Sequence, residues 1–147
     1  MAERCASIPA EKARDAAERA AAILGRRPDV GLVYVYGSTA DVGQRMVRDV
    51  DLAVLTDRPL TVDEIVRLRA DLVQTLEVDV DLVSLNEATI VLAHEVIEAG
   101  RCLYARSDDL ETDFVIRARS RYWDFAPFRA EQWRLLGERL EERRRGP

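Results

Sequence analysis

The sequence has few of the side chains that build disulfides, zinc sites and nucleophilic triads. Its 147 residues include one histidine, His94, and two cysteines, Cys5 and Cys102. The cysteines form no C-x-x-C pair, so we expect neither a disulfide framework nor a structural zinc site. A single histidine makes a Ser-His-Asp triad or a histidine-rich metal cage a poor interpretation. Any catalysis is therefore expected to use carboxylates.

Long apolar runs are also missing. No run approaches the roughly 18 residues that a membrane-spanning helix needs, and the charged start does not resemble a secretory signal. Hydrophobic residues nevertheless make up 48% of the chain, which is ordinary for a packed core. We therefore expect a soluble, cytoplasmic protein with no membrane partner.

Basic residues are scarce in the middle of the chain. Residues 28–100 contain 14 acidic and five basic side chains. Binding of nucleic acid needs a basic surface, so no direct nucleic-acid partner is expected. An acidic segment of this kind suits a divalent cation better.

Hydrophobic periodicity predicts an α/β fold, in which strands alternate with helices and a helical part follows. We expect three parts: an N-terminal helix within 1–27, a core at 28–106 and a C-terminal helical extension at 107–147. Asn86 is expected to cap a helix, and Pro127 to separate the last two helices. The predicted strands are 30–36, 50–55, 77–85 and 101–105; the predicted helices are 11–25, about 61–76, 86–99, 107–125 and 129–145.

The pair Gly37-Ser38 directly follows the first predicted strand. Glycine lets the backbone approach a ligand closely, and free N–H groups at the start of a helix bind phosphate. Asp49 and Asp51 lie two residues apart at the second predicted strand, so both carboxylates face one side. Carboxylates held together in this way repel each other unless a cation lies between them, and Mg²⁺ prefers such ligands.

A third carboxylate is available from the third predicted strand, where Asp79 and Asp81 share a face. If that strand lies beside the second, at a spacing of about 4.8 Å, either acid can join the pair. Three acids beside a glycine-serine turn would form a two-metal site for phosphoryl or nucleotidyl transfer.

Gly37-Ser38, ten intervening residues and Asp49-Val50-Asp51 match the signature of the polymerase-beta-like nucleotidyltransferases. The sequence resembles this family from residue 30 to about residue 128. In length it is similar to the minimal nucleotidyltransferases, and among these to the MntA-type antitoxins that pair with HEPN-domain toxins of the HepT type. The resemblance includes Val80 to Val83, similar to the third-carboxylate strand, Gly100 to Tyr104, and Arg121 to Phe125.

The resemblance implies a polymerase-beta-like fold, with a small mixed sheet flanked by helices, and a role for each motif residue. Gly37 and Ser38 would bind the nucleotide, and Asp81 would join Asp49 and Asp51 as catalytic residues and metal ligands. It further implies Mg²⁺ in a two-metal site, which Mn²⁺ can replace, and ATP as substrate. The product would be AMP on a tyrosine hydroxyl of a HEPN ribonuclease toxin, which the chain would neutralise as part of a hetero-oligomer.

One position departs from the family pattern, and two other functions stay open. Arg48 stands where the family usually carries serine, so the loop before Asp49 could hold nucleotide differently. A non-catalytic antitoxin would act by binding the toxin alone. A small-molecule nucleotidyltransferase of the antibiotic-modifying kind would need a larger acceptor domain than the residues after Tyr104 provide. The aromatic residues of the C-terminal part pack its helices together or form a partner surface: Trp123, Phe125, Phe128 and Trp133.

Overall fold

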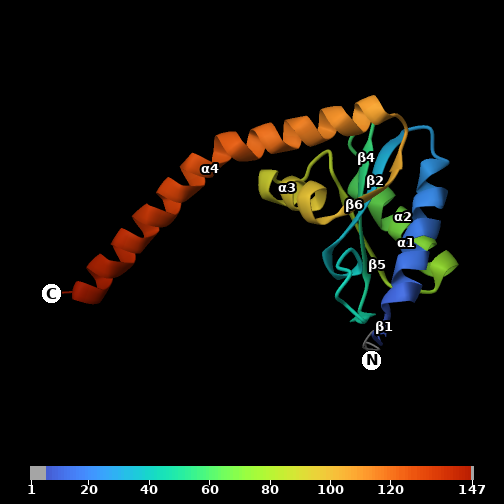
Figure 1. Cartoon of the computed structure of the whole chain (residues 1–147), viewed down its shortest axis with the longest axis horizontal. Helices are drawn as coiled ribbons and strands as arrows, with labels where there is room; N and C mark the ends of the chain where they lie inside the picture. The colour runs from blue at the N-terminus through green and yellow to red at the C-terminus, as the bar shows by residue number, and fades with distance from the viewer. Residues whose placement is uncertain (1–5, 147) are drawn as a thin grey trace.

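A mixed four-stranded sheet carries helices on both of its faces (Figure 1). The structure is a computed structural model that describes residues 6–146, so Cys5 and the start of the predicted N-terminal part lie outside the described residues. The strands are β1 (Ile8–Pro9), β2 (Val30–Tyr36), β3 (Met46–Val47), β4 (Val50–Thr56), β5 (Val80–Ser84) and β6 (Arg101–Ala105). The helices are α1 (Ala10–Gly25), the 3-10 turn η1 (Gly37–Thr39), α2 (Val62–Leu76), α3 (Ile90–Ala99) and α4 (Asp108–Arg145).

The strand order of the main sheet is β5-β4-β2-β6. β2 pairs antiparallel with β4 and with β6, whereas β4 and β5 are parallel because α2 carries the chain back between them. The small mixed sheet expected from the sequence is confirmed. Its third predicted strand does lie beside the second, which was the condition for a third carboxylate.

Alternate residues of the strands enter two separate cores. On one face, alternate apolar side chains such as Val33 and Leu52 pack against the alanine-rich side of α1 and the buried leucines of α2. On the other face, Leu32 and Ala53 pack under α3 and the first turns of α4. The period-two alternation of a strand therefore divides these residues between the two helical layers.

The prediction of two C-terminal helices divided at Pro127 is wrong. α4 is one helix of 38 residues with Pro127 inside it. Proline lacks the N–H that would bond to the carbonyl four residues earlier, and its ring crowds that carbonyl, which bends a helix but need not end it. Figure 1 shows α4 bending about midway along its length.

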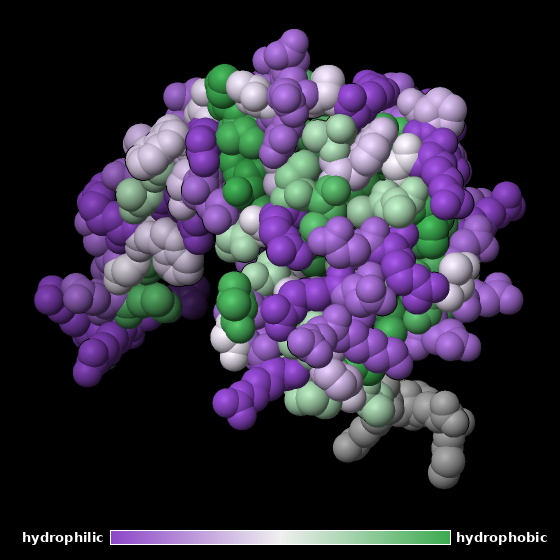
Figure 2. Space-filling model, turned by 45° about the vertical axis from the view of Figure 1, so that its right-hand side comes forward, coloured by the Kyte–Doolittle hydropathy of each residue, from purple (hydrophilic) through white to green (hydrophobic). Residues whose placement is uncertain are grey.

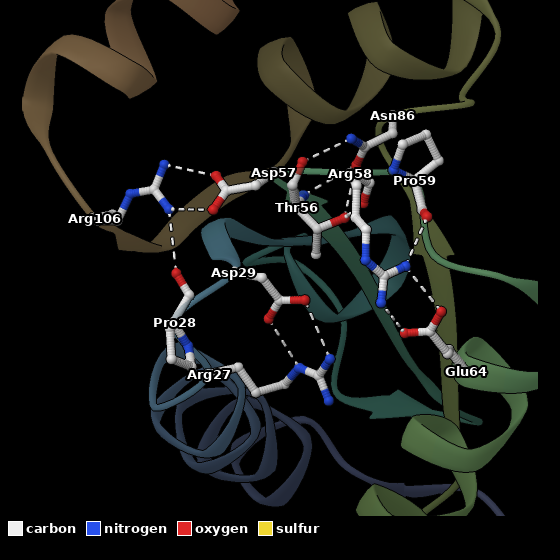
Figure 3. Close-up of polar contacts among 10 residues, drawn as sticks. All are labelled: Arg27, Pro28, Asp29, Thr56, Asp57, Arg58, Pro59, Glu64, Asn86 and Arg106. Atoms are coloured by element: carbon white, nitrogen blue, oxygen red, sulfur yellow. Dashed lines mark hydrogen bonds and ion pairs between the residues drawn. The ribbon is translucent and has the colours of Figure 1, made fainter.

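The start of the third long helix was also predicted wrongly. Thr89, not Asn86, is the N-cap of α3, and its side chain accepts a hydrogen bond from the N–H of Leu92 at 3.1 Å. Asn86 instead pairs with the backbone of Thr56: its Oδ1 accepts from the Thr56 N–H at 3.0 Å, and its Nδ2 donates to the Thr56 carbonyl at 2.7 Å (Figure 3). Asn86 therefore joins the end of β4 to the chain after β5.

Two smaller differences concern short segments. β5 is shorter than the predicted strand, because Glu77 adopts φ 56° and ends α2 before the strand begins. The two-residue strands β1 and β3 pair antiparallel, a contact that sequence periodicity over two residues cannot reveal.

Within residues 6–146, no helix is both long enough and apolar enough to span a membrane.

Candidate active site

The chain turns sharply at Gly37, where β2 gives way to η1. Gly37 has φ 67°, a left-handed conformation that favours glycine. A Cβ at this position would overlap Oδ2 of Asp51 and lie 3.3 Å from its Cγ. Glycine is therefore required twice, for the turn itself and for the close approach of the backbone to the carboxylate.

Thr39 fastens this turn to the chain that enters β4. Its side chain is 2% exposed, and its Oγ1 donates a hydrogen bond to the Asp49 carbonyl at 3.2 Å. Asp49 itself lies immediately before β4 rather than in it. The hydrogen bond closes the ten-residue loop between Ser38 and Asp49, and so brings both halves of the motif together.

Asp51 and Asp81 lie side by side on neighbouring parallel strands. They are paired residues in the register of β4 and β5, so their side chains leave the same face of the sheet. Asp79 comes just before β5, where its carbonyl accepts a hydrogen bond from the Val50 N–H at 2.9 Å. The structure thus brings Asp49, Asp51 and Asp81 to one end of the sheet, beside Gly37 and Ser38.

The acids disturb each other's ionisation. Burial raises the pKa of Asp51 from 3.8 to about 6, and the negative charges of Asp49 and Asp81 contribute further. The charge of Asp81 contributes to the raised pKa of Asp51, whereas that of Asp79 does not. A carboxyl group whose pKa is raised by burial and by unbalanced negative charge is a typical feature of a functional site, including one that binds a cation.

Two residues that sequence reasoning did not assign to the site lie next to the acids. Tyr36 is the register partner of Asp51 across β2 and β4. The pKa of Tyr36 is raised to about 12, mainly by burial. The negative charges of nearby acids also raise it, and these acids are Asp51, Asp81, Glu95 on α3, and Asp49. The position of Tyr36 directly before Gly37 was a visible signal, whereas Glu95 reaches the site only through the packing of α3.

The donor set fits Mg²⁺ rather than a metal enclosed by protein. Within residues 6–146, no group of three or more His, Cys, Asp or Glu side chains is placed to hold a metal ion by itself. Mg²⁺ is usually held by one or two carboxylates, and waters and substrate phosphates complete its octahedron. Asp49 and Asp51, beside a backbone turn that a Cβ would fill, offer this open arrangement.

A cavity of about 380 Å³ lies elsewhere, between the end of β4 and the first parts of α3 and α4. None of the five residues predicted for the site lines it. The cavity lies where β2 starts and β4 ends. Tyr36, at the end of β2, pairs with Asp51 near the start of β4, so the cavity and the carboxylates lie at opposite ends of the sheet.

Fold and site together define a nucleotidyltransferase: the chain belongs to the family described as polymerase beta, nucleotidyltransferase, whose model matches residues 18–109. The family resemblance expected from the sequence is therefore confirmed. Among named relatives, the chain is 36% identical over 97 residues to protein adenylyltransferase MntA of Shewanella oneidensis strain MR-1. The match covers 65% of this chain and 68% of the relative.

Solved structures agree with this assignment. One is the tri-AMPylated HEPN toxin of Shewanella oneidensis in complex with MNT antitoxin, where the similar chain has a TM-score of 0.67 and 26% identity. That match covers 86% of this chain and 98% of the other. A second is a toxin-antitoxin structure with AMP-PNP, with a TM-score of 0.69, 29% identity and coverage of 84% and 98%.

Proposed function

We propose that this chain is an antitoxin that acts as a protein adenylyltransferase in the cytoplasm. It transfers AMP from ATP to a tyrosine hydroxyl of a HEPN-domain ribonuclease toxin, its partner in a hetero-oligomer, and so silences that toxin. The identity to an enzyme named protein adenylyltransferase supports this proposal, as do the similar chains from toxin-antitoxin structures.

The observation that carries the proposal is the contact between Gly37 and Asp51. Glycine at this position keeps the space beside the Asp51 carboxylate free of a side chain, as the close binding of phosphate oxygens and a cation requires. Asp81, the register partner of Asp51, extends the same acidic surface.

Each motif residue has a role in this proposal. Gly37 and Ser38 hold the terminal phosphates of ATP. Asp49 and Asp51 would hold Mg²⁺, or Mn²⁺ in its place, and Asp81 would complete a two-metal site. Bound there, the ions polarise the phosphate oxygens and offset the negative charge that develops in the transition state.

The transfer is a substitution at the α-phosphorus. The tyrosine oxygen forms a bond to that phosphorus, the bond to the oxygen that bridges the α- and β-phosphorus breaks, and pyrophosphate leaves. Asp81 helps to remove the proton of the attacking hydroxyl, which must lie within hydrogen-bond reach of the carboxylate. AMP adds bulk and negative charge to the toxin near its active site.

The test uses ATP radiolabelled at the α-phosphorus and the cognate HEPN-domain toxin, sought among the genes that neighbour this one. The wild-type chain should label that protein with Mg²⁺ or Mn²⁺, and mass spectrometry should find AMP on tyrosine. The variant with Asp49→Asn and Asp51→Asn should label nothing while keeping its circular dichroism spectrum. Asp79→Asn is the matched control, because it removes a nearby carboxylate that does not act on Asp51.

Two results would contradict parts of the proposal. Equal labelling in excess chelator would contradict the metal assignment. Full protection of cells by the double variant, without any AMP transfer, would instead show that neutralisation occurs by binding alone.

A further inference from the structure

The outer half of α4 projects away from the body of the molecule (Figure 1). We call residues 126–145 the arm. Trp133, Leu136 and Leu140 on the arm are 62%, 45% and 56% exposed. Their spacing of i, i+3 and i+7 places them on one side of the helix, and we call these three residues the arm stripe. Apolar side chains arranged in this way usually anchor a partner.

The arm stripe continues the face of α4 that already packs on the body. Eighteen residues are five helical turns, so Leu136 lies on the face of Ala118, and Leu140 on that of Tyr122. Ala118 is buried, and Tyr122 stacks on His94 of α3 with ring centroids 3.6 Å apart. The face of α4 that packs on the body therefore continues along the arm, where no part of the described chain covers it.

Pro127 turns this face inward. It lies nine residues, or two and a half turns, after Ala118, and so on the opposite side of the helix. Crowding between the proline ring and the preceding turn opens the helix on the proline side, so the axis bends toward the packing face. In Figure 2 the arm forms a lobe separated from the body by a recess.

The arm is held in helical form by its own charges. Arg134 forms ion pairs with Glu131 and with Glu138, at the i, i+3 and i, i+4 spacings that stabilise an exposed helix. The stripe is therefore presented on a preformed helix, which reduces the conformational entropy lost on binding.

α3 connects the arm to the acidic site. On one side, Glu98 accepts a hydrogen bond from Arg119 of α4 at 2.6 Å, and His94 stacks on the same helix. On the other side, α3 ends against β2: a Cβ at its C-cap, Gly100, would lie 3.2 Å from the Cβ of Tyr36. A protein held in the recess under the arm would therefore lie along α3, which leads to the carboxylates.

We infer that the arm stripe docks the protein that accepts AMP, an inference that rests on the proposed function. A second copy of this chain fits less well as the occupant. Large apolar side chains have areas of up to ~250 Å², so the exposed parts of the three stripe residues together amount to only about 300–400 Å² per copy. Pairing two copies would bury well under the roughly 1,200 Å² of a stable interface. An acceptor protein can contact the stripe, α3 and the rim of the site together.

The experiment compares two double variants of the full chain. Leu136→Ala with Leu140→Ala removes most of the stripe. Ile116→Ala with Val66→Ala is the matched control, since both residues are 58% exposed and Ile116 lies on the outer face of α4. Titration with the cognate HEPN-domain toxin should show a Kd at least about tenfold higher for the stripe variant, as expected for central interface anchors. The control should bind within twofold of wild type.

AMP-PNP with Mg²⁺ separates this inference from the proposed function. The stripe variant should bind AMP-PNP as the wild type does, and should label the acceptor at the wild-type rate once acceptor is saturating. Unchanged acceptor affinity in the stripe variant would overturn the inference while the proposed function stands. If the wild type binds the acceptor through the stripe but never labels it, the proposed function fails, and with it the claim that the bound protein is an AMP acceptor.

Two further measurements sharpen the choice of occupant. With Trp123→Phe and fluorotryptophan incorporation, Trp133 gives the single fluorine NMR signal, which should shift when acceptor is added; no shift would overturn the inference. Sedimentation of the chain alone should give a similar mass for wild type and stripe variant. A wild-type dimer that the stripe variant loses would assign the stripe to a second copy instead.

Discussion

Acidic side chains lie at both ends of the central sheet, but only one end neutralises them. At the end where β2 starts and β4 finishes, three acids have an arginine partner (Figure 3). At the other end, no arginine in residues 6–146 forms an ion pair with the motif acids. The paired contacts are Arg27–Asp29 at 3.2 Å, Arg106–Asp57 at 2.9 Å and Arg58–Glu64 at 3.0 Å.

The pKa shifts run in opposite directions at the two ends. The hydrogen bond from Arg106 lowers the pKa of Asp57, and the one from Arg58 lowers that of Glu64 to about 2. Burial and neighbouring acids raise the pKa of Asp51 to about 6. Paired acids at the first end connect loops and helices, whereas the unpaired acids at the other end are left for a ligand that brings its own positive charge.

The largest expected effect comes from neutralising the unpaired end. Asp51→Asn should lower the rate of AMP transfer about a thousandfold, because a lost metal ligand removes several kcal/mol of transition-state stabilisation at about 1.4 kcal/mol per tenfold. Single-turnover transfer to the HEPN-domain protein measures this effect. A loss of less than tenfold would mean that Asp51 is not a ligand.

The next effect comes from filling the space beside Asp51. Gly37→Ala should slow transfer about tenfold to a hundredfold and destabilise the fold by about 1–2 kcal/mol, since it places a Cβ at positive φ and against the carboxylate. Gly43→Ala, where the nearest atom would be 3.4 Å away, is the control. Urea denaturation and transfer assays on both variants separate the two effects.

A third effect appears in stability when no metal is present. Because the pKa of Asp51 is about 6 in the folded chain and has its ordinary value of 3.8 in the unfolded chain, the folded chain binds the proton more tightly between these values. The charged carboxylate therefore destabilises the fold fully above pH 6 and not below about pH 4. Asp51→Asn should stabilise by about 1–2 kcal/mol at pH 7.5, after allowance for solvent screening, and by progressively less toward pH 4. A gain that is constant with pH would contradict this electrostatic origin.

The smallest effect is expected at the paired end. Arg106→Gln removes an exposed ion pair with Asp57, and such pairs contribute little to stability. Thermal unfolding should show a fall in Tm of about 2 °C or less, and AMP transfer should be unchanged. A large loss of transfer would mean that the two ends of the sheet are coupled.

The features that the sequence predicted are those with a local physical signal. Hydrophobic periodicity located the strands that carry Asp51 and Asp81, and α2 starts close to its predicted position, where Thr61 and Glu64 form a capping box. The features that it did not predict depend on distant contacts. Asn86 has the chemistry of a helix cap, but the backbone of Thr56, thirty residues away, takes up its amide.

The same distinction applies to the candidate site. The Gly37-Ser38 and Asp49-Asp51 spacing was visible in one stretch of chain, and the structure brings both parts together through Thr39. Glu95 could not be foreseen, because a helix residue comes near Tyr36 only once α3 has packed on the sheet. The assignment of the five motif residues stays a prediction until the variants above are assayed.

The strand order also has a consequence for how the chain folds during its synthesis. β2 pairs with β4, and β4 with β5, so the segments that bear the motif acids can assemble once residue 84 has emerged. The other edge of β2 must wait for β6, whose Ala105 pairs with Leu32 from 73 positions away in the sequence. Until then the apolar strand Val30–Tyr36 presents unpaired N–H and C=O groups, which are a template for aggregation. A chain truncated before β6 would therefore carry the motif acids but expose the open edge of β2, through which we expect it to associate.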